Sequence, residues 1–248
     1  MKKYIVPKFI KDIYACISGH GTHRAVENLQ RYMRIAQRQY EKNYYILKMD
    51  IKKFFYNIDH EILFEIMSDY IGDKKLLKFT KLLIDSDDES VGIPIGNYTS
   101  QFCANIYLDR LDKFVKHDIK VKYYVRHMDD FILLLEDRET ARNIFNEIQI
   151  FLNNNLRLSL NSKSQYYPCS FGADFCGYCV WSTHKLIKRN SIKKIKRSIK
   201  KWNKLYTKNK LRMPDFVLSF NSWLGHVKHA GSYNLKRKII EKIIFIYN

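Results

Sequence analysis

Several features that mark other protein classes are missing from this chain of 248 residues. No apolar run approaches the roughly 20 residues that a membrane-spanning helix needs. Residues 1–7 also lack the apolar stretch of a secretory signal peptide. Five cysteines, an odd number, do not indicate a disulfide framework. We therefore expect a cytoplasmic protein that does not enter a membrane.

Cysteine is also too sparse for a convincing zinc site. A CxxC spacing occurs at residues 176–179, with Cys169 before it and His184 after it. The sequence contains no second CxxC, and the segment alternates like a β-strand. We therefore favour small core cysteines over metal ligands here.

Acidic residues are scarce relative to basic ones. The chain has 25 Asp plus Glu against 44 Lys plus Arg, a formal net charge of +19. Such a surplus favours a polyanionic partner, either nucleic acid or an anionic membrane surface, although a surplus that only aids solubility is the simpler alternative. Hydrophobic residues make up 46% of the chain and aromatic residues 15%, which is typical of a packed globular protein.

The hydrophobic pattern predicts an α+β core followed by a small, basic, helical domain, with a boundary near Asn190. Helical spacing and cap signals predict helices over residues 22–40, 60–70, 74–84, 99–116 and 139–153. Short apolar or alternating runs predict strands over residues 44–50, 120–126, 131–135, 158–160, 175–181 and 185–188.

Carboxylates stand at the ends of apolar strands in two places. Asp50 ends the strand over residues 44–50, and Asp129-Asp130 form the tip of a predicted hairpin. Adjacent acids on a buried hairpin are unfavourable unless something compensates their charge. Two Mg²⁺ ions roughly 3.5–4 Å apart would do so, and they suit in-line phosphoryl transfer. The alternative is a plain Asp-Asp turn without chemistry.

The segments around these acids resemble the catalytic motifs of reverse transcriptases. Residues 124–130, Tyr-Val-Arg-His-Met-Asp-Asp, look like the aromatic-x-Asp-Asp motif, and residues 50–55, Asp-Ile-Lys-Lys-Phe-Phe, resemble the first catalytic motif. His127 stands where the family usually has Tyr. The resemblance implies a right-hand polymerase, with partial fingers over residues 1–43, a palm with inserted fingers helices over 44–189, and a helical basic thumb over 190–248.

A third motif resembles one group within that family. Residues 95–101, Ile-Gly-Asn-Tyr-Thr-Ser-Gln, are similar to reverse transcriptases of diversity-generating retroelements, where most relatives have Gln-Gly followed by Ser-Pro. Residues 12–25 and 222–226 also look like that group, whose members carry more fingers sequence upstream. The resemblance implies adenine-mutagenic copying of a template-repeat RNA with a primer and dNTPs, through an RNA–DNA hybrid. It also implies a small basic accessory oligomer as partner.

The resemblance further implies a role for single residues. The two Mg²⁺ ions would be held at Asp50, Ile51, Asp129 and Asp130, and Lys163 would act in catalysis near the triphosphate. Phe55 would be a steric gate that rejects the 2′-hydroxyl of ribonucleotides. The incoming nucleotide and template would also meet Arg24, Ile51, Gly96, Ser100 and Gln101. A primer grip would be formed by Phe175, Cys176, Gly177 and Tyr178.

Other functions remain open on this sequence. A group II intron-like, retron-like or phage-defence reverse transcriptase is the nearest alternative. A catalytically silent, nucleic-acid-binding palm scaffold is an alternative from a different class. A membrane-surface binder would fit the charge but leaves the acids unexplained.

Overall fold

The computed structural model describes residues 2–41, 43–84, 90–94 and 98–246. The chain divides into two compact units, Met1–Phe171 and Gly172–Asn248. The sequence also predicts fingers, palm and thumb regions, with boundaries after residues 43 and 189. This division stays a prediction. Among the described residues, no helix combines the length and the apolar character that a membrane span requires.

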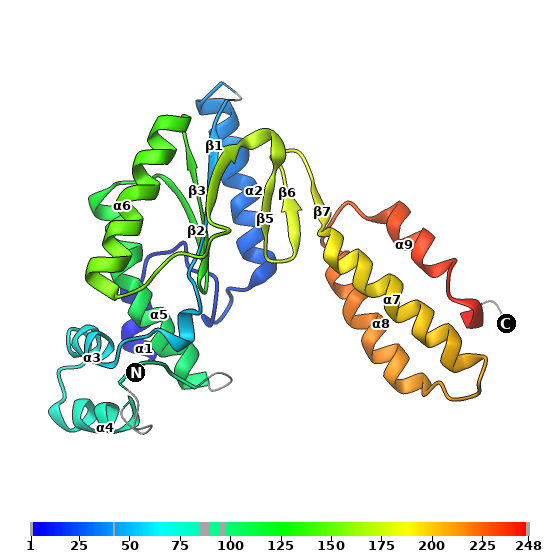
Figure 1. Cartoon of the computed structure of the whole chain (residues 1–248), viewed down its shortest axis with the longest axis horizontal. Coiled ribbons are helices and arrows are strands. Elements are labelled where there is room, and N and C mark those ends of the chain that lie inside the picture. The colour runs from blue at the N-terminus through cyan, green and yellow to red at the C-terminus, as the bar shows by residue number, and fades with distance from the viewer. Residues whose placement is uncertain (1, 42, 85–89, 95–97, 247–248) are drawn as a thin grey trace. The chain divides into compact units, whose positions relative to one another are not determined.

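A four-stranded antiparallel sheet forms the centre of the first unit (Figure 1). Its strands are β1 (Tyr45–Asp50), β2 (Tyr123–His127), β3 (Asp130–Leu135) and β4 (Gln165–Pro168), in the order β2-β3-β1-β4. The two central strands, β1 and β3, are rich in the aliphatic residues that a half-buried or buried sheet favours. Their register pairs Tyr45 with Leu135 at one end and Asp50 with Asp130 at the other.

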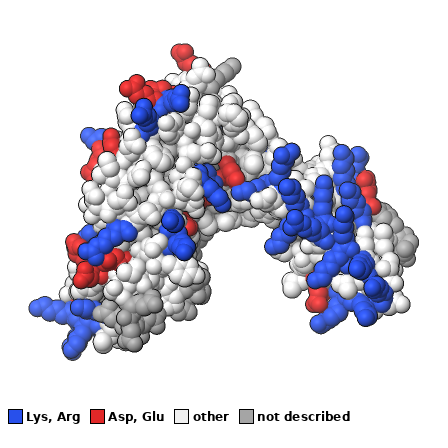
Figure 2. All heavy atoms as spheres, viewed as in Figure 1, with Lys and Arg blue, Asp and Glu red and all other residues white. Residues whose placement is uncertain are grey.

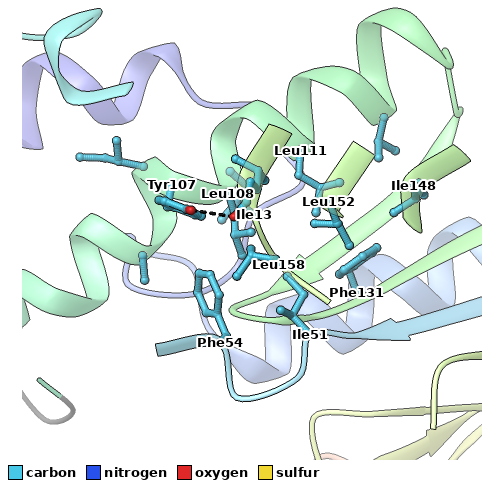
Figure 3. Close-up of a cluster of buried hydrophobic side chains, with 14 of the residues drawn as sticks. Ile13, Ile51, Phe54, Tyr107, Leu108, Leu111, Phe131, Ile148, Leu152 and Leu158 are labelled. Atoms are coloured by element: carbon cyan, nitrogen blue, oxygen red, sulfur yellow. Dashed lines mark hydrogen bonds between the residues drawn. The ribbon is translucent and has the colours of Figure 1, made fainter. Parts of the chain in front are cut away.

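Helices cover this sheet because β2 and β3 carry buried side chains at consecutive positions, and consecutive side chains point to opposite faces. Helix α2 (Thr22–Gln39) packs against β2 and β3. Helix α6 (Arg138–Leu156) packs against β1, β3 and β4, and α5 (Tyr98–Lys113) packs against α6. On the α5 and α6 side, Phe131 and Ile51 belong to the same buried cluster as Ile148, Leu152 and Leu158 (Figure 3).

The remaining elements of the first unit connect and brace this layer. They are α1 (Lys2–Ile5), η1 (Val6–Lys8), η2 (Phe54–Tyr56), α3 (His60–Ser68), α4 (Lys74–Ile84), the π-helix η3 (Phe114–Asp118) and η4 (Cys169–Phe171). Asp59 caps α3 by accepting a hydrogen bond from the Ile62 N–H (3.0 Å). The same carboxylate pairs with Arg157 at 2.6 Å. Hydrogen bonds from Ile62 and Arg157 lower the pKa of Asp59, although its burial acts in the opposite direction.

The second unit combines a small sheet with a helical group. Strands β5 (Ala173–Phe175), β6 (Tyr178–Val180) and β7 (Lys185–Ile187) form an antiparallel sheet. Helices α7 (Arg189–Tyr206), α8 (Met213–Val227) and α9 (Tyr233–Ile240) follow, with η5 (Ile244–Ile246) after them. Trp202 meets Phe216 edge-on, with ring centroids 5.0 Å apart, and Phe216 stacks on Phe220.

The structure corrects two of the predicted strands and adds one that was not predicted. Residues 158–160 form no strand: Leu158 is a buried core residue, and Leu160 makes an isolated bridge to Ile51. The fourth strand of the sheet is instead β4, which the pattern did not predict. The predicted strand over residues 175–181 is a hairpin, because Cys176 and Gly177 both have positive φ and reverse the chain.

Candidate active site

The two central strands bring two of the predicted carboxylates together. Asp50 ends β1 and lies directly opposite Asp130, the first residue of β3. Side chains that stand opposite each other in an antiparallel pair lie on one face of the sheet. Lys48 lies two residues before Asp50 on this face, and its Nζ is 3.5 Å from Oδ2 of Asp130. The sheet register therefore concentrates two acids and one lysine.

A tight turn between β2 and β3 carries Asp129. Met128 precedes it with a φ of +57°, a left-handed conformation that residues with a Cβ seldom adopt. The Ile51 N–H donates a hydrogen bond to the Asp129 carbonyl oxygen (3.2 Å), which connects the turn to the end of β1. The side chain of Ile51 is buried, so only its main chain takes part in this contact.

Burial disfavours the charged forms of these acids. It raises the pKa of Asp130 to about 7, with Asp50 and Asp129 adding to the increase and Lys48 opposing it. Burial also raises the pKa of Asp129, where Asp50 again adds to the effect. His127, opposite Asp130 on β2, has its pKa lowered by burial and is mainly neutral at pH 7. His127 therefore adds little positive charge beside the acids.

The chemistry of this cluster fits a divalent cation. Within the described residues, Oδ1 of Asp130 is buried and has no hydrogen-bond partner. A buried carboxylate oxygen without a partner is unfavourable, and hard cations such as Mg²⁺ prefer carboxylate ligands. No three His, Cys, Asp or Glu side chains in the described part of the chain form a ready metal-binding group.

A turn that follows α6 contacts the main chain of Asp50. The Asp50 carbonyl oxygen accepts hydrogen bonds from the Asn161 N–H (2.8 Å) and the Ser164 hydroxyl (3.2 Å). The Asp50 N–H is 3.0 Å from Ser164 Oγ. Lys163 lies in this turn with an exposed side chain. The structure therefore brings the Lys163 segment to Asp50, and the catalytic role of Lys163 stays a prediction.

Phe55 lies in η2, close after Asp50 in the chain. Its half-buried ring packs against Phe54, with ring centroids 5.5 Å apart. The Phe55 carbonyl oxygen accepts a hydrogen bond from the Ile93 N–H (2.9 Å), which holds residues 91–94 beside η2. Gly96, predicted to approach the nucleotide, lies outside the described residues.

Ser100 and Gln101 lie in the first turn of α5. Ser100 is buried, whereas Gln101 is half-buried. The Cys16 thiol donates to Gln101 Oε1 (3.1 Å) and lies 3.7 Å from the sulfur of Met128. Gln101 is therefore linked through one cysteine to the turn that carries Asp129.

Arg24 belongs to a different part of the first unit. It lies on α2, and its Nη1 donates to the Gly19 carbonyl oxygen (2.8 Å). It also lines a cavity of about 580 Å³, together with Lys11, Asp12, Tyr14, His20, Glu27, Asn28, Arg31 and Tyr32. Neither Asp50 nor Asp130 lines this cavity. The predicted role of Arg24 at the triphosphate therefore stays a prediction.

The predicted primer grip is the β5–β6 hairpin of the second unit. Phe175 pairs with Tyr178, and Cys176-Gly177 form the two-residue turn between them. Both turn residues have positive φ, +48° and +84°, as tight hairpins require. The Tyr178 hydroxyl donates to the carbonyl oxygen of His226 on α8 (2.8 Å), which fixes the hairpin on that helix.

Three contributors to the site were not predicted: Lys48, Ser164 and Cys16. Alternation along β1 was enough to place Lys48 on the face of Asp50, so the sequence held a signal for it. Ser164 and Cys16 reach the site only through tertiary contacts between segments more than 100 residues apart. No local pattern marks such contacts.

Comparisons with known proteins agree with this geometry. Residues 1–180 match the family model described as reverse transcriptase (RNA-dependent DNA polymerase). The chain is 25% identical to the putative COX1/OXI3 intron 2 protein of Saccharomyces cerevisiae, in a match that covers 56% of this chain and 24% of that protein.

Solved telomerase structures share the fold. Apo telomerase from Candida tropicalis, truncated from its C-terminal domain, matches with a TM-score of 0.58 at 13% identity, over 72% of this chain and 41% of that one. Telomerase from Candida albicans with a fragment of telomeric RNA matches with a TM-score of 0.54 at 13% identity, over 73% of this chain and 38% of that one. This chain thus spans about a quarter of the curated relative and about two-fifths of these telomerases. The predicted α+β polymerase palm is confirmed, and the chain belongs to the reverse transcriptase (RNA-dependent DNA polymerase) family.

Proposed function

We propose that this chain is an RNA-directed DNA polymerase whose active site is the carboxylate cluster of Asp50, Asp129 and Asp130. The pairing of Asp50 with Asp130, with a buried carboxylate oxygen that lacks a partner, is the observation that carries the proposal. A buried carboxylate oxygen without a hydrogen bond is open to a hard cation, which prefers carboxylate ligands.

Divalent ions such as Mg²⁺ are the metals that this family generally uses, and two of them would be held by these three acids. When bound, they supply charge neutralisation for nucleotidyl transfer. Asp129 and Asp130 act from the β2–β3 turn, and Asp50 acts from β1. Lys48 is close enough to Asp130 to reduce the repulsion among the acids while the site is metal-free.

The remaining predicted residues receive matching roles. Phe55 rejects the 2′-hydroxyl of the incoming nucleotide, and Lys163 acts on the triphosphate from the turn that contacts Asp50. Gly96, Ser100 and Gln101 contact the nucleotide and template, and Arg24 contributes from α2. Residues 175–178 hold the primer end. The hairpin geometry, and the link from Gln101 to Met128 through Cys16, support these assignments.

Template RNA and the RNA–DNA hybrid are the proposed polyanionic partners. Helix α7 carries a dense set of exposed basic residues: Lys193, Lys194, Lys196, Arg197, Lys200, Lys201 and Lys204. Figure 2 shows Lys and Arg side chains spread widely over the visible face of the second unit. Such a surface suits the phosphates of an A-form duplex.

The finer proposal is that this chain is a diversity-generating reverse transcriptase of the cytoplasm. It copies a template-repeat RNA with errors opposite adenine. It works together with a small basic accessory oligomer. The Ile-Gly-Asn-Tyr-Thr-Ser-Gln segment over residues 95–101 supports it. An intron-type reverse transcriptase is the second candidate, because the curated relative is described as a putative intron 2 protein.

Primer extension tests the proposal directly. Purified protein, a primed RNA template, Mg²⁺ and dNTPs are combined, with Asp129→Ala/Asp130→Ala as the control. We expect extension by the wild type, loss of extension by more than about 100-fold in the variant, and RNA affinity that is largely retained. Errors concentrated opposite adenine would favour the diversity-generating type over the intron type. No extension by the wild type, with an accessory partner supplied, would leave a silent nucleic-acid-binding scaffold instead.

A further inference from the structure

A buried ion pair lies behind the turn that carries Asp129. The side chains of Arg126, on β2, and Asp112, on α5, are both fully buried. Arg126 Nε lies 2.7 Å from one carboxylate oxygen of Asp112, and Nη2 lies 2.6 Å from the other. This two-point pairing fixes the plane of the guanidinium group.

Further hydrogen bonds satisfy the groups around this pair. The Tyr124 hydroxyl donates to Asp112 Oδ1 (2.7 Å), and Arg126 Nη1 donates to Asn105 Oδ1 (3.1 Å). Asn105 in turn donates to the Ala15 carbonyl oxygen (2.8 Å). The network thereby connects α5, β2 and the segment that precedes α2.

One more donor of the same guanidinium reaches the turn. Arg126 Nη1 donates to the carbonyl oxygen of Met128 (3.0 Å), the residue in the left-handed conformation before Asp129. The main chain of Arg126 is fixed as well: its N–H donates to the Asp12 carbonyl oxygen (3.0 Å), and its carbonyl oxygen accepts from the Tyr14 N–H (2.9 Å). The Met128 carbonyl oxygen therefore accepts a hydrogen bond from a charged guanidinium group that is fixed by its other contacts.

We infer that Arg126, oriented by Asp112, is a positioning residue that sets the geometry of the Asp129-Asp130 turn. The left-handed Met128 is unfavourable by itself, so the turn needs an external contact to keep this conformation. The guanidinium supplies it at the Met128 carbonyl oxygen. This inference rests on the proposed function, because it concerns the placement of the same acids.

A role in stability alone is the competing explanation, and the physics of buried ion pairs separates the two. Removing one partner leaves an uncompensated buried charge and is strongly destabilising, whereas replacing both partners with apolar residues of similar volume is often neutral for stability. The variant Asp112→Leu/Tyr124→Phe/Arg126→Met removes both charges and the hydroxyl that would lose its acceptor. We expect folding to be largely retained, whereas the hydrogen bonds from Arg126 to the Met128 carbonyl oxygen and to Asn105 Oδ1 are lost.

The experiment compares this apolar triple variant with the wild type in thermal melting, RNA binding and single-nucleotide extension. We expect a melting temperature and an RNA affinity close to those of the wild type, a kcat at least about tenfold lower, and a KM for dNTP changed by less than about threefold. Full kcat in a stable triple variant would overturn the inference. If the wild type itself does not extend the primer, the proposed function fails, which is a separate result.

A readout without metal or substrate tests the turn by itself. The Ile51 amide donates to the Asp129 carbonyl oxygen, so its hydrogen exchange in metal-free protein reports the position of the turn. We expect at least about tenfold faster exchange at Ile51 in the triple variant, with unchanged exchange at the centre of β1. Unchanged protection at Ile51 would contradict a positioning role.

Two further variants complete the test. Asp109→Leu/Lys113→Met removes another ion pair of α5, with Nζ and Oδ2 2.7 Å apart, that does not contact the turn. We expect wild-type kcat and Ile51 exchange from this control.

Arg126→Lys decides if the triple variant fails to fold. Lysine keeps the charge beside Asp112 but lacks the forked guanidinium group that also reaches Met128. Normal kcat in a folded Arg126→Lys protein would overturn the inference.

Discussion

At the scale of single residues, Asp130 shows how a proposed catalytic group opposes folding. Its pKa is raised to about 7 in the folded protein by burial, from an ordinary value of 3.8, with Asp50 and Asp129 adding to the shift. The folded protein therefore holds the Asp130 proton more tightly than the unfolded chain does. Stability consequently falls as pH rises from about 4 to about 7, and it stays lower above that window.

This pKa leads to a stability prediction for Asp130→Asn in metal-free protein. The amide cannot ionise, so the variant avoids the cost of the buried charge. We expect it to melt about 5 °C above the wild type at pH 8 and within about 1 °C of it at pH 5. Thermal melts in a chelator at both pH values measure this difference. The same gain at both pH values would show that packing, and not ionisation of Asp130, is responsible.

Phe55 has a prediction of its own at this scale. Phe55→Ala removes the ring proposed to meet a 2′-hydroxyl, so we expect the preference for dNTP over NTP to fall by at least about tenfold. Single-nucleotide incorporation with matched dNTP and NTP measures it, as a ratio of kcat/KM values. Tyr56→Ala is the control, because Tyr56 is the next aromatic residue and its side chain is exposed. An unchanged ratio for Phe55→Ala would remove the gate assignment.

At the scale of elements, the sequence predicted what depends on local pattern. Helix α2, strand β1 and the Asp59 cap of α3 follow from spacing and cap chemistry within a few residues. Strand β4 was missed because Gln165-Tyr166-Tyr167-Pro168 has little apolar alternation and ends in proline. It is a strand because it pairs with the edge of β1. The strand pattern and the family resemblance together marked the three acids, whereas the contacts of Ser164 and Arg126 depend on packing between distant segments.

The β5–β6 hairpin gives a prediction at this scale. Gly177 has a φ of +84°, and an added Cβ would lie 3.2 Å from Cε1 of His226. Gly177→Ala is therefore strained in its backbone and crowded against α8, and we expect it to lower the free energy of unfolding of the second unit by about 1–2 kcal/mol. Chemical denaturation followed by the fluorescence of the tryptophans measures it. Gly225→Ala on α8 is the matched control, because an added Cβ there meets nothing within 4 Å. Equal stability of the two variants would argue against a constrained hairpin.

At the scale of the whole molecule, the net charge of +19 is the dominant property. The charge alone does not say which lysines meet nucleic acid. On α7, the buried residues are Ile195, Ile199 and Trp202. A stripe of exposed cations lies on the opposite side of the helix: Lys193, Arg197, Lys200 and Lys204. An amphipathic helix with only a solvated outer face would show the same pattern, so binding must be measured.

The salt dependence of binding separates a stripe that contacts phosphates from one whose charges only aid solubility. Each lysine that contacts a phosphate adds about 1 to the slope of log affinity against log salt concentration. We therefore expect Lys200→Gln/Lys204→Gln to reduce the slope for an RNA–DNA hybrid by about 2. The charge-matched control is Lys74→Gln/Lys75→Gln, two exposed lysines of α4. If both pairs reduce the slope equally, net charge alone governs binding. If neither does, the α7 stripe does not contact the hybrid, and the proposed thumb role of this helix is wrong.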